Sequence, residues 1–292
     1  MKFRTEIKIE DAPLKLSPER QLLLAGSCFS DYIGARLEYL GWPAVVNPCG
    51  VIYNPVSMSL LLRLALASRA IRREIVASAV TRRDQMFVSW FMSSVVMEST
   101  EENCIDRVCA RLDLLEKAIE KSEAMILTFG TSDVWLLAGT DRAVGNCHKH
   151  PSSEFEKRRI GVEEMVADWV ELIKMVRMRN PDIGVILTVS PRRYLAEGFA
   201  DNSRQKAILL LGCEKLCQEV ENTFYFPAYE IMNDDLRDYR FYGKDLVHPS
   251  EMAVDYIWEK FTETFMDSSG LSVLKQIETQ AKRSAHRKRA GS

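Results

Sequence analysis

The sequence predicts an α/β fold in which helices cover both faces of a parallel five-stranded sheet. Short apolar runs alternate with amphipathic stretches along the chain, an order typical of βαβ units. Each run is apolar at nearly every position, as expected of a strand that is buried on both faces. The five runs span residues 22–25, 44–46, 125–129, 183–189 and 223–226.

Helices are predicted between and after these runs. Apolar residues recur at helical spacing over residues 162–178, and this stretch stops before Pro181. Amphipathic stretches near residues 31–40 and 204–221 predict two further helices. A last helix begins after Pro249 and runs to about residue 265. Helical connections of this kind allow all five strands to lie parallel.

Residues 56–123 read as an insertion. They contain a basic helix at residues 60–73, a β-hairpin around residues 75–96 and a charged helix near residues 105–121. No flexible linker borders them, so we expect a cap that packs near the carboxyl ends of the strands. We therefore predict one domain over residues 1–268, followed by a basic tail at residues 269–292 that is solvated or frayed.

Composition and charge exclude several classes of function. Hydrophobic residues make up 47% of the 292 residues, which is enough for a sizeable core, and the formal net charge is -2. This balance predicts neither nucleic acid nor a membrane surface as a partner. The seven cysteines are odd in number and scattered, which favours free thiols in a reducing compartment. The first residues lack the apolar stretch of a signal peptide, so we expect a cytoplasmic protein.

The stretch Gly-Ser-Cys-Phe-Ser at residues 26–30 joins the first apolar run to a helix. Backbone N–H groups at a helix N-terminus point outward and favour negative charge. From this position Ser27 could attack a carbonyl carbon, or it could simply cap the helix. Cys28 is the alternative nucleophile, because two neighbouring side chains on one turn cannot both face the same base.

A carboxylate and an imidazole stand three residues apart just before the last helix, at Asp245 and His248. In a loop, this spacing can place the carboxylate beside the ring, where it orients the imidazole and stabilises its protonated form. His148 and His150 are the other candidate bases outside the tail, and neither has an acid partner at this spacing. We therefore predict Ser27 as nucleophile, His248 as base and Asp245 as the orienting acid, and we expect neither a cofactor nor a metal ion.

The turns after the second and third apolar runs offer hydrogen-bond donors at the same edge of the sheet. Gly50 follows the second run and can present its backbone N–H with no side chain in the way. Ser132 follows the third run and can offer a hydroxyl donor. Sites in such sheets form beyond the carboxyl ends of the strands, so we expect both groups to lie near Ser27.

Four features recur here in chain order: the Gly-Ser-Cys-Phe-Ser stretch, the turn with Gly50, the turn with Ser132 and the Asp245–His248 pair. Together they resemble the sequence blocks of the SGNH, or GDSL-like, hydrolase superfamily. That superfamily has a serine after strand one, a glycine after strand two, Gly-x-Asn-Asp after strand three and Asp-x-x-His near the C-terminus. The resemblance is closer to the GSCFA family, whose namesake stretch appears here as GSCFS. Further sequence segments similar to the family are NPCGVIYNP, GNCHKHP, LTVSPRRY and a long run over residues 225–258. The resemblance covers roughly residues 5–265.

The resemblance implies a flavodoxin-like three-layer fold with the sheet order 2-1-3-4-5 and an oxyanion hole that includes the N–H groups of Ser27 and Gly50. Ser132 stands where the superfamily has its asparagine donor, so Ser132, Asn146 or a backbone N–H takes that role. The implied function is that of a serine hydrolase, an esterase or deacetylase whose substrate is a small-molecule or carbohydrate acyl ester. The alternatives are an O-acyltransferase and a non-catalytic binding module that retains the fold.

Overall fold

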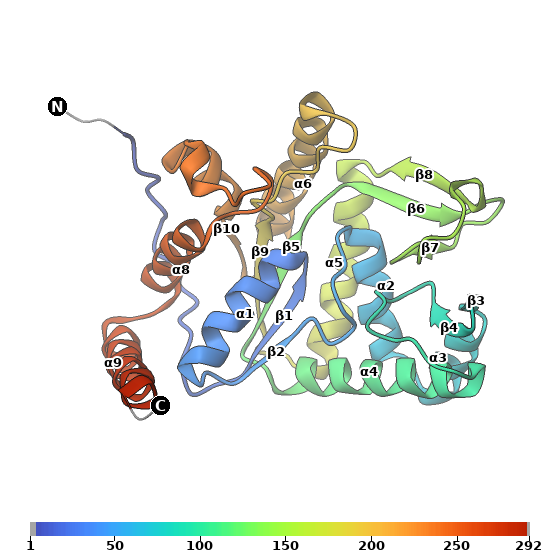
Figure 1. Cartoon of the computed structure of the whole chain (residues 1–292), viewed down its shortest axis with the longest axis horizontal. Helices are drawn as coiled ribbons and strands as arrows, with labels where there is room; N and C mark the ends of the chain where they lie inside the picture. The colour runs from blue at the N-terminus through green and yellow to red at the C-terminus, as the bar shows by residue number, and fades with distance from the viewer. Residues whose placement is uncertain (1–3, 291–292) are drawn as a thin grey trace.

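A parallel sheet of five strands forms the centre of the protein (Figure 1). The computed structural model describes residues 4–290 and the side chains of residues 4–280. Its sheet has the order β10–β9–β5–β1–β2, so the predicted order 2-1-3-4-5 is confirmed. The strands are β1 (Leu22–Gly26), β2 (Ala44–Val46), β5 (Ala124–Phe129), β9 (Gly184–Val189) and β10 (Thr223–Phe226).

Helices cover both faces of this sheet, because successive side chains of a strand point to opposite sides. Leu22 and Leu24 of β1 lie in one apolar cluster with residues of α1 and α8. Leu23, between them, lies in a second cluster with residues of α5 and α6. The three-layer prediction is therefore confirmed. The four helices are α1 (Cys28–Leu40), α5 (Val162–Arg179), α6 (Phe199–Glu219) and α8 (Glu251–Phe265).

Two of these helices begin earlier than the sequence predicts. Helix α1 begins at Cys28 because the side-chain oxygen of Ser27 accepts a hydrogen bond from the N–H of Phe29 at 3.3 Å. This N-cap satisfies a donor that has no partner within the helix. Helix α6 begins at Phe199, directly after Gly198, whose φ of 88° is a left-handed conformation that glycine adopts readily.

The insertion contains two helices where we predicted one basic helix over residues 60–73. The chain is extended at Ala67 and Ser68, with ψ of 158° and 150°. The guanidinium of Arg72 turns back and donates to the carbonyls of Leu64 and Ala67 at 2.9 and 3.2 Å. Arg72 thus satisfies the last carbonyls of the first helix, which explains the break. The elements are α2 (Pro55–Leu66), α3 (Arg69–Ala77), β3 (Val80–Arg83), β4 (Met86–Ser89) and α4 (Glu101–Lys121).

The expected placement of the insertion as a cap is wrong for its helices. Helices α2 and α4 lie in the same layer as α5 (Figure 1) and contribute to the same apolar cluster. The apolar stripe of α4 includes Val108, Leu112 and Ile119, all fully buried, and this stripe holds the helix on the sheet face. The loop after β4 does approach the carboxyl edge, because Ser93 lies against Gly50.

A small antiparallel sheet of order β7–β6–β8 was not predicted. It follows β5 directly and extends the molecule away from the central sheet (Figure 1). The third strand reads Phe-Glu-Lys-Arg-Arg, so most of its side chains are exposed and it lacks an apolar run. Its elements are β6 (Asp133–Leu137), β7 (Ala143–Val144) and β8 (Phe155–Arg159), with a short helical turn, η1, at Ser152–Glu154.

The segment after residue 268 is helical rather than frayed, and most of its described side chains are exposed while one face packs. Leu274 is buried, and Leu271 and Ile277 pack against the cluster of α1 and α8. This apolar spacing of three residues gives the helix one packed face. The side chains of the basic stretch that begins at residue 282 lie outside the described residues. The remaining elements are α7 (Ala228–Glu230), η2 (Ile231–Asp235), η3 (Tyr239–Phe241) and α9 (Ser268–Ala290).

No helix among the described residues combines the length and the apolar character needed to cross a lipid bilayer.

Candidate active site

The carboxyl edge of the sheet brings together three loops that are far apart in the sequence. The β1–α1 turn meets the loop after β9 through a 3.0 Å hydrogen bond between Ser27 Oγ and Ser190 Oγ. The loop after β9 meets the loop before α8, because the N–H of Arg193 donates to the carbonyl of Val247 at 3.2 Å. His248 follows Val247 in the chain. The loop of the predicted nucleophile and the loop of the predicted base therefore both contact the loop after β9.

Ser27 is fully buried, and its polar atoms have partners inside the fold. Its Oγ accepts from Phe29 and is hydrogen-bonded to Ser190, and its N–H donates to the carbonyl of Thr128 at 3.1 Å. Among the described residues, no hydrogen bond joins Ser27 to His248. Ser27 as the nucleophile that His248 activates therefore stays a prediction.

Asp245 and His248 form the predicted pair. Asp245 Oδ2 lies 2.6 Å from His248 Nδ1, and Oδ1 accepts the backbone N–H groups of Val247 and His248 at 3.0 Å each. These bonds, led by the one to the imidazole, hold the pKa of Asp245 well below its usual range. An ionised carboxylate beside Nδ1 favours the tautomer that carries its proton there, which leaves Nε2 free to accept one. The His248 side chain is 28% exposed, so the ring is accessible from solvent.

Two of the predicted oxyanion donors, the N–H groups of Ser27 and Gly50, already have partners in the fold. The N–H of Ser27 is bonded to Thr128, and the N–H of Gly50 donates to the carbonyl of Asn47 at 2.8 Å in a tight turn. Asn146 lies near the small sheet, where its side chain accepts the N–H of His148 at 2.7 Å. These two N–H groups do not form an open oxyanion hole in this structure, because strand β5 uses that of Ser27 and a local turn uses that of Gly50.

Gly50 is required for a different reason from the one that we predicted. Its φ of 79° is left-handed, and a Cβ at this position would lie 1.9 Å from Ser93 Oγ. The glycine thus allows the loop after β4 to approach the turn closely.

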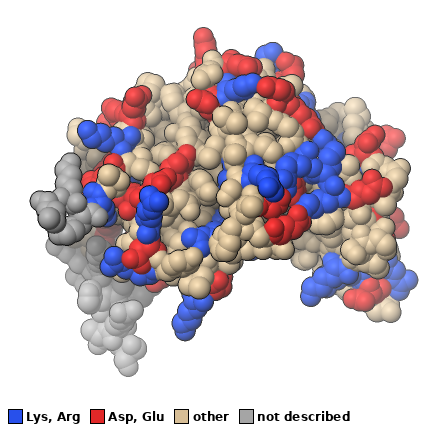
Figure 2. All heavy atoms as spheres, turned by 90° about the horizontal axis from the view of Figure 1, so that it is seen from above, with Lys and Arg blue, Asp and Glu red and all other residues tan. Residues whose placement is uncertain are grey.

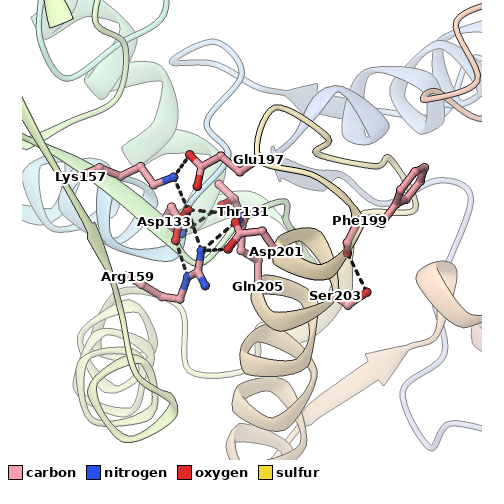
Figure 3. Close-up of polar contacts among 9 residues, drawn as sticks. All are labelled: Thr131, Asp133, Lys157, Arg159, Glu197, Phe199, Asp201, Ser203 and Gln205. Carbon is pink, nitrogen blue, oxygen red and sulfur yellow. Dashed lines mark hydrogen bonds and ion pairs between the residues drawn. The ribbon is translucent and has the colours of Figure 1, made fainter.

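Ser132 is fully buried, and within the part of the chain that the structure describes its hydroxyl has no hydrogen-bond partner. A network of charged and polar groups holds the turn that carries it (Figure 3). Asp133 binds Arg159 through two hydrogen bonds of 2.7 and 3.1 Å, and Arg159 also binds Asp201 at the start of α6. Gln205 bridges the two carboxylates at 3.1 and 2.6 Å. The turn after β5 is therefore anchored to both α6 and β8.

The carboxylates of Asp133, Glu197 and Asp201 lie within 4.8 Å of one another, a spacing that a metal ion could bridge. Arg159 and Lys157 already give these carboxylates cationic partners (Figure 3). We therefore interpret the cluster as an ion-pair network that stabilises the turn after β5.

The model of the GSCFA family matches residues 21–261. The chain belongs to the GSCFA family. No curated protein shows significant sequence similarity to it.

Solved structures resemble this GSCFA chain only distantly. A Streptococcus pneumonia structure named for platelet activating factor has 11% identity and a TM-score of 0.41, covering 85% of this chain and 86% of its own. The acetyl xylan esterase Est2A from Butyrivibrio proteoclasticus has 12% identity and a TM-score of 0.36, with coverages of 86% and 66%. A family 3 carbohydrate esterase from Clostridium thermocellum has 9% identity and a TM-score of 0.35, with coverages of 89% and 98%. At this similarity, the activity of the GSCFA chain must be argued from its own site.

Sequence reasoning missed a buried lysine beneath this edge. Lys206 of α6 is 1% exposed, and its ammonium donates to the carbonyls of Gly130 and Ser190 at 2.8 and 2.7 Å. It also lies 4.8 Å from the ring centre of Tyr194. Burial, and then the charge of Arg192, lower the pKa of Lys206. Lys206 therefore links the residues that follow β5 and β9. The sequence signal for a buried lysine was its position within an apolar stretch of a predicted helix.

The histidines of the GNCHKHP stretch have structural partners. His148 is 2% exposed, its Nε2 lies 2.8 Å from the carbonyl of Ser89, and burial lowers its pKa. His150 lies 3.1 Å from Glu154 and packs edge-on against Trp90. These contacts join the hairpin of the insertion to the small sheet.

Proposed function

We propose that this protein hydrolyses acyl esters, with His248 as general base, Asp245 as its orienting acid, and a nucleophile from the β1–α1 turn. The observation that carries the proposal is the 2.6 Å contact between Asp245 Oδ2 and His248 Nδ1 at an exposed position on the carboxyl edge. An imidazole held in this way can take a proton from a nucleophile and return it to the leaving group. With Ser27 as the nucleophile, the mechanism is the Ser-His-Asp mechanism expected from the sequence.

Exposed aromatic rings beside the base support a carbohydrate ester as substrate. The backbone N–H of Arg193 donates to the carbonyl of Val247. The Arg193 Cζ lies 4.0 Å from the ring centre of Tyr242 and 5.2 Å from that of Tyr239. Tyr239 and Phe199 are 60% and 61% exposed, and both rings face the guanidinium of Arg193. Flat apolar rings next to polar groups suit the mixed surface of a sugar. An O-acetylated carbohydrate is therefore the substrate class that we propose.

We also propose that the protein does not bind nucleic acid and that it is cytoplasmic. The distribution of charged side chains supports the first point, and the cysteines support the second. In Figure 2, which looks onto the upper side of Figure 1, basic and acidic side chains are interspersed over the described part of that face. A nucleic-acid-binding surface would instead gather basic side chains. All seven cysteines are free thiols, which supports a reducing cytoplasmic location.

The test is hydrolysis of an aryl acetate by the wild type and by His248→Ala. Loss of the base should lower kcat/KM by at least about a hundredfold. The matched control is His150→Ala, which removes another histidine paired with a carboxylate, the Glu154 partner at 3.1 Å. Product that forms only when an alcohol acceptor is added would identify a transferase. Saturable sugar binding without turnover would identify a binding module, and either result would overturn the hydrolase proposal.

A further inference from the structure

Ser27 and Cys28 are adjacent in the chain but lie in different environments. Ser27 is fully buried, and its Oγ and N–H bond to groups of α1, β5 and the loop after β9. Cys28 is only partly buried and its thiol is free. As the first residue of α1, Cys28 has no helical partner for its N–H, and in the described part of the chain this N–H donates to no oxygen. The accessible nucleophilic group of the turn is therefore the Cys28 thiol.

The face of helix α1 that carries Cys28 also pairs with α8, the helix that follows the loop of the base. Cys28, Tyr32 and Arg36 are four residues apart and so share one face of the helix. Arg36 forms an ion pair with Asp255 of α8, the helix that follows the His248 loop. The pKa of Tyr32 is raised by burial and by the charges of Cys28 and Asp245. The Arg36–Asp255 ion pair therefore turns this face of α1 toward α8, the helix that the Asp245–His248 loop precedes.

Two polar groups on the loop after β9 also bear on this site. The hydroxyl of Tyr194 and the Nε of Arg192 are buried, and among the described side chains neither atom has a hydrogen-bond partner of ordinary geometry. A Cβ on Gly130 would lie 2.3 Å from the Tyr194 hydroxyl, which is therefore directed at the turn after β5. The Arg192 guanidinium lies 4.8 Å from the centre of the Tyr194 ring, and its charge acts on Cys28. Buried donors without acceptors are costly in a folded protein unless a ligand oxygen completes them.

We propose that Cys28, rather than Ser27, is the nucleophile of this site, an inference that rests on the ester hydrolysis proposed above. His248 Nε2 takes the thiol proton as Sγ attacks the acyl carbon of the ester. The bond from this carbon to the alcohol oxygen breaks, and the leaving alkoxide takes the proton from His248. The products of this step are a thioester on Cys28 and a free alcohol.

Water completes the cycle. It gives one proton to His248 and attacks the thioester, which releases a carboxylic acid and the sulfur, and His248 returns the proton to the sulfur. Burial raises the pKa of Cys28, although Arg192 opposes this effect. The group is therefore a thiol at neutral pH and needs a base, which His248 supplies. Ser27 is a positioning residue that caps α1 and holds its first turn against Ser190.

The first experiment maps the acyl-enzyme. A reaction with aryl acetate is stopped early, and the acetyl group is located by peptide fragmentation in the wild type and in Ser27→Gly. Glycine is chosen because it replaces serine at an N-cap at a cost of only a few tenths of a kcal/mol, so folding should be retained. We expect acetyl on Cys28 in both proteins, released by neutral hydroxylamine as a thioester. Acetyl on the Ser27 oxygen of the wild type would overturn the inference.

Rates give the second readout. Cys28→Ala should lower kcat/KM for the aryl acetate by at least about a thousandfold, as removal of a nucleophile does. The matched control is Cys109→Ala, which removes another partly buried free thiol, on α4, and should leave the rate unchanged. Cys28→Ala that retains full turnover would overturn the inference while leaving the ester hydrolase proposal intact.

Alkylation tests the Cys28–His248 pairing without ester turnover. Iodoacetamide should modify Cys28 at least about tenfold more slowly in His248→Ala than in the wild type at neutral pH, because the thiolate is the reactive form. The modification rate of Cys109 should not change. A wild type without esterase activity would refute the proposed function alone. Equal alkylation rates of Cys28 in the two proteins would refute the assignment of Cys28 to the base.

Discussion

Asp245→Asn tests whether the carboxylate sets the tautomer of the base. Asp245 Oδ1 accepts two backbone N–H groups and Oδ2 accepts the imidazole Nδ1–H at 2.6 Å. Asparagine keeps a carbonyl oxygen for the backbone donors but turns an NH₂ group toward Nδ1. The imidazole then carries its proton on Nε2 and cannot accept one from the nucleophile.

The size of the effect follows from the exposure of the pair. A fully buried carboxylate in this role contributes about 10⁴-fold to kcat. The Asp245 side chain is 51% exposed, so water can take part of its place. We therefore expect a loss of about 10²–10³-fold in kcat/KM for an aryl acetate, with residual activity because the imidazole remains.

The matched control is Asp238→Asn. Asp238 Oδ1 also accepts a backbone N–H two residues on, that of Arg240 at 2.9 Å, but it contacts no histidine. Its variant should match the wild type in activity. The pair also affects stability: because the pKa of Asp245 is lowered in the folded state, its stabilising effect is present above the usual carboxyl range and is lost as the pH falls through the lowered value. Asp245→Asn should lack this acid-dependent loss in urea unfolding measured across pH. Activity of Asp245→Asn within threefold of wild type would refute the role assigned to the carboxylate.

Two further changes test the groups beneath the edge. Lys206→Met leaves the carbonyls of Gly130 and Ser190 without their donor, so the free energy of unfolding should fall by about 2–4 kcal/mol in urea titration, partly offset by removal of a buried charge; a change below about 0.5 kcal/mol, as expected for the exposed control Lys215→Met, would contradict this. Ser132→Ala removes a buried hydroxyl that has no partner, so unfolding should be unchanged or up to about 1 kcal/mol more costly. If the Ser132 hydroxyl is an oxyanion donor, kcat should fall by at least about tenfold, and an unchanged kcat would exclude this role.

The central sheet was predictable because its strands are local apolar runs. Each of the five runs lies within one residue of an observed strand at both ends, and β5 and β9 are buried at every position. The small sheet was not predictable, because β8 is mostly polar and its pairing with β6 depends on contacts such as Asp133 with Arg159. The predicted position of the insertion as a cap was wrong for a similar reason. An apolar stripe such as that of α4 can pack against the sheet face or against a cap, and only the tertiary packing determines which.

The sequence by itself determined the Asp245–His248 pair, because residues three apart in a tight loop meet through local backbone geometry. It also placed a serine and a cysteine at the start of α1. Only the tertiary structure decided which of the two is accessible. Ser27 is turned inward by Ser190, which is 163 residues away in the chain, and by the carbonyl of Thr128 on β5. Local pattern cannot report such a contact, because it arises only when three strands end at one edge of the sheet.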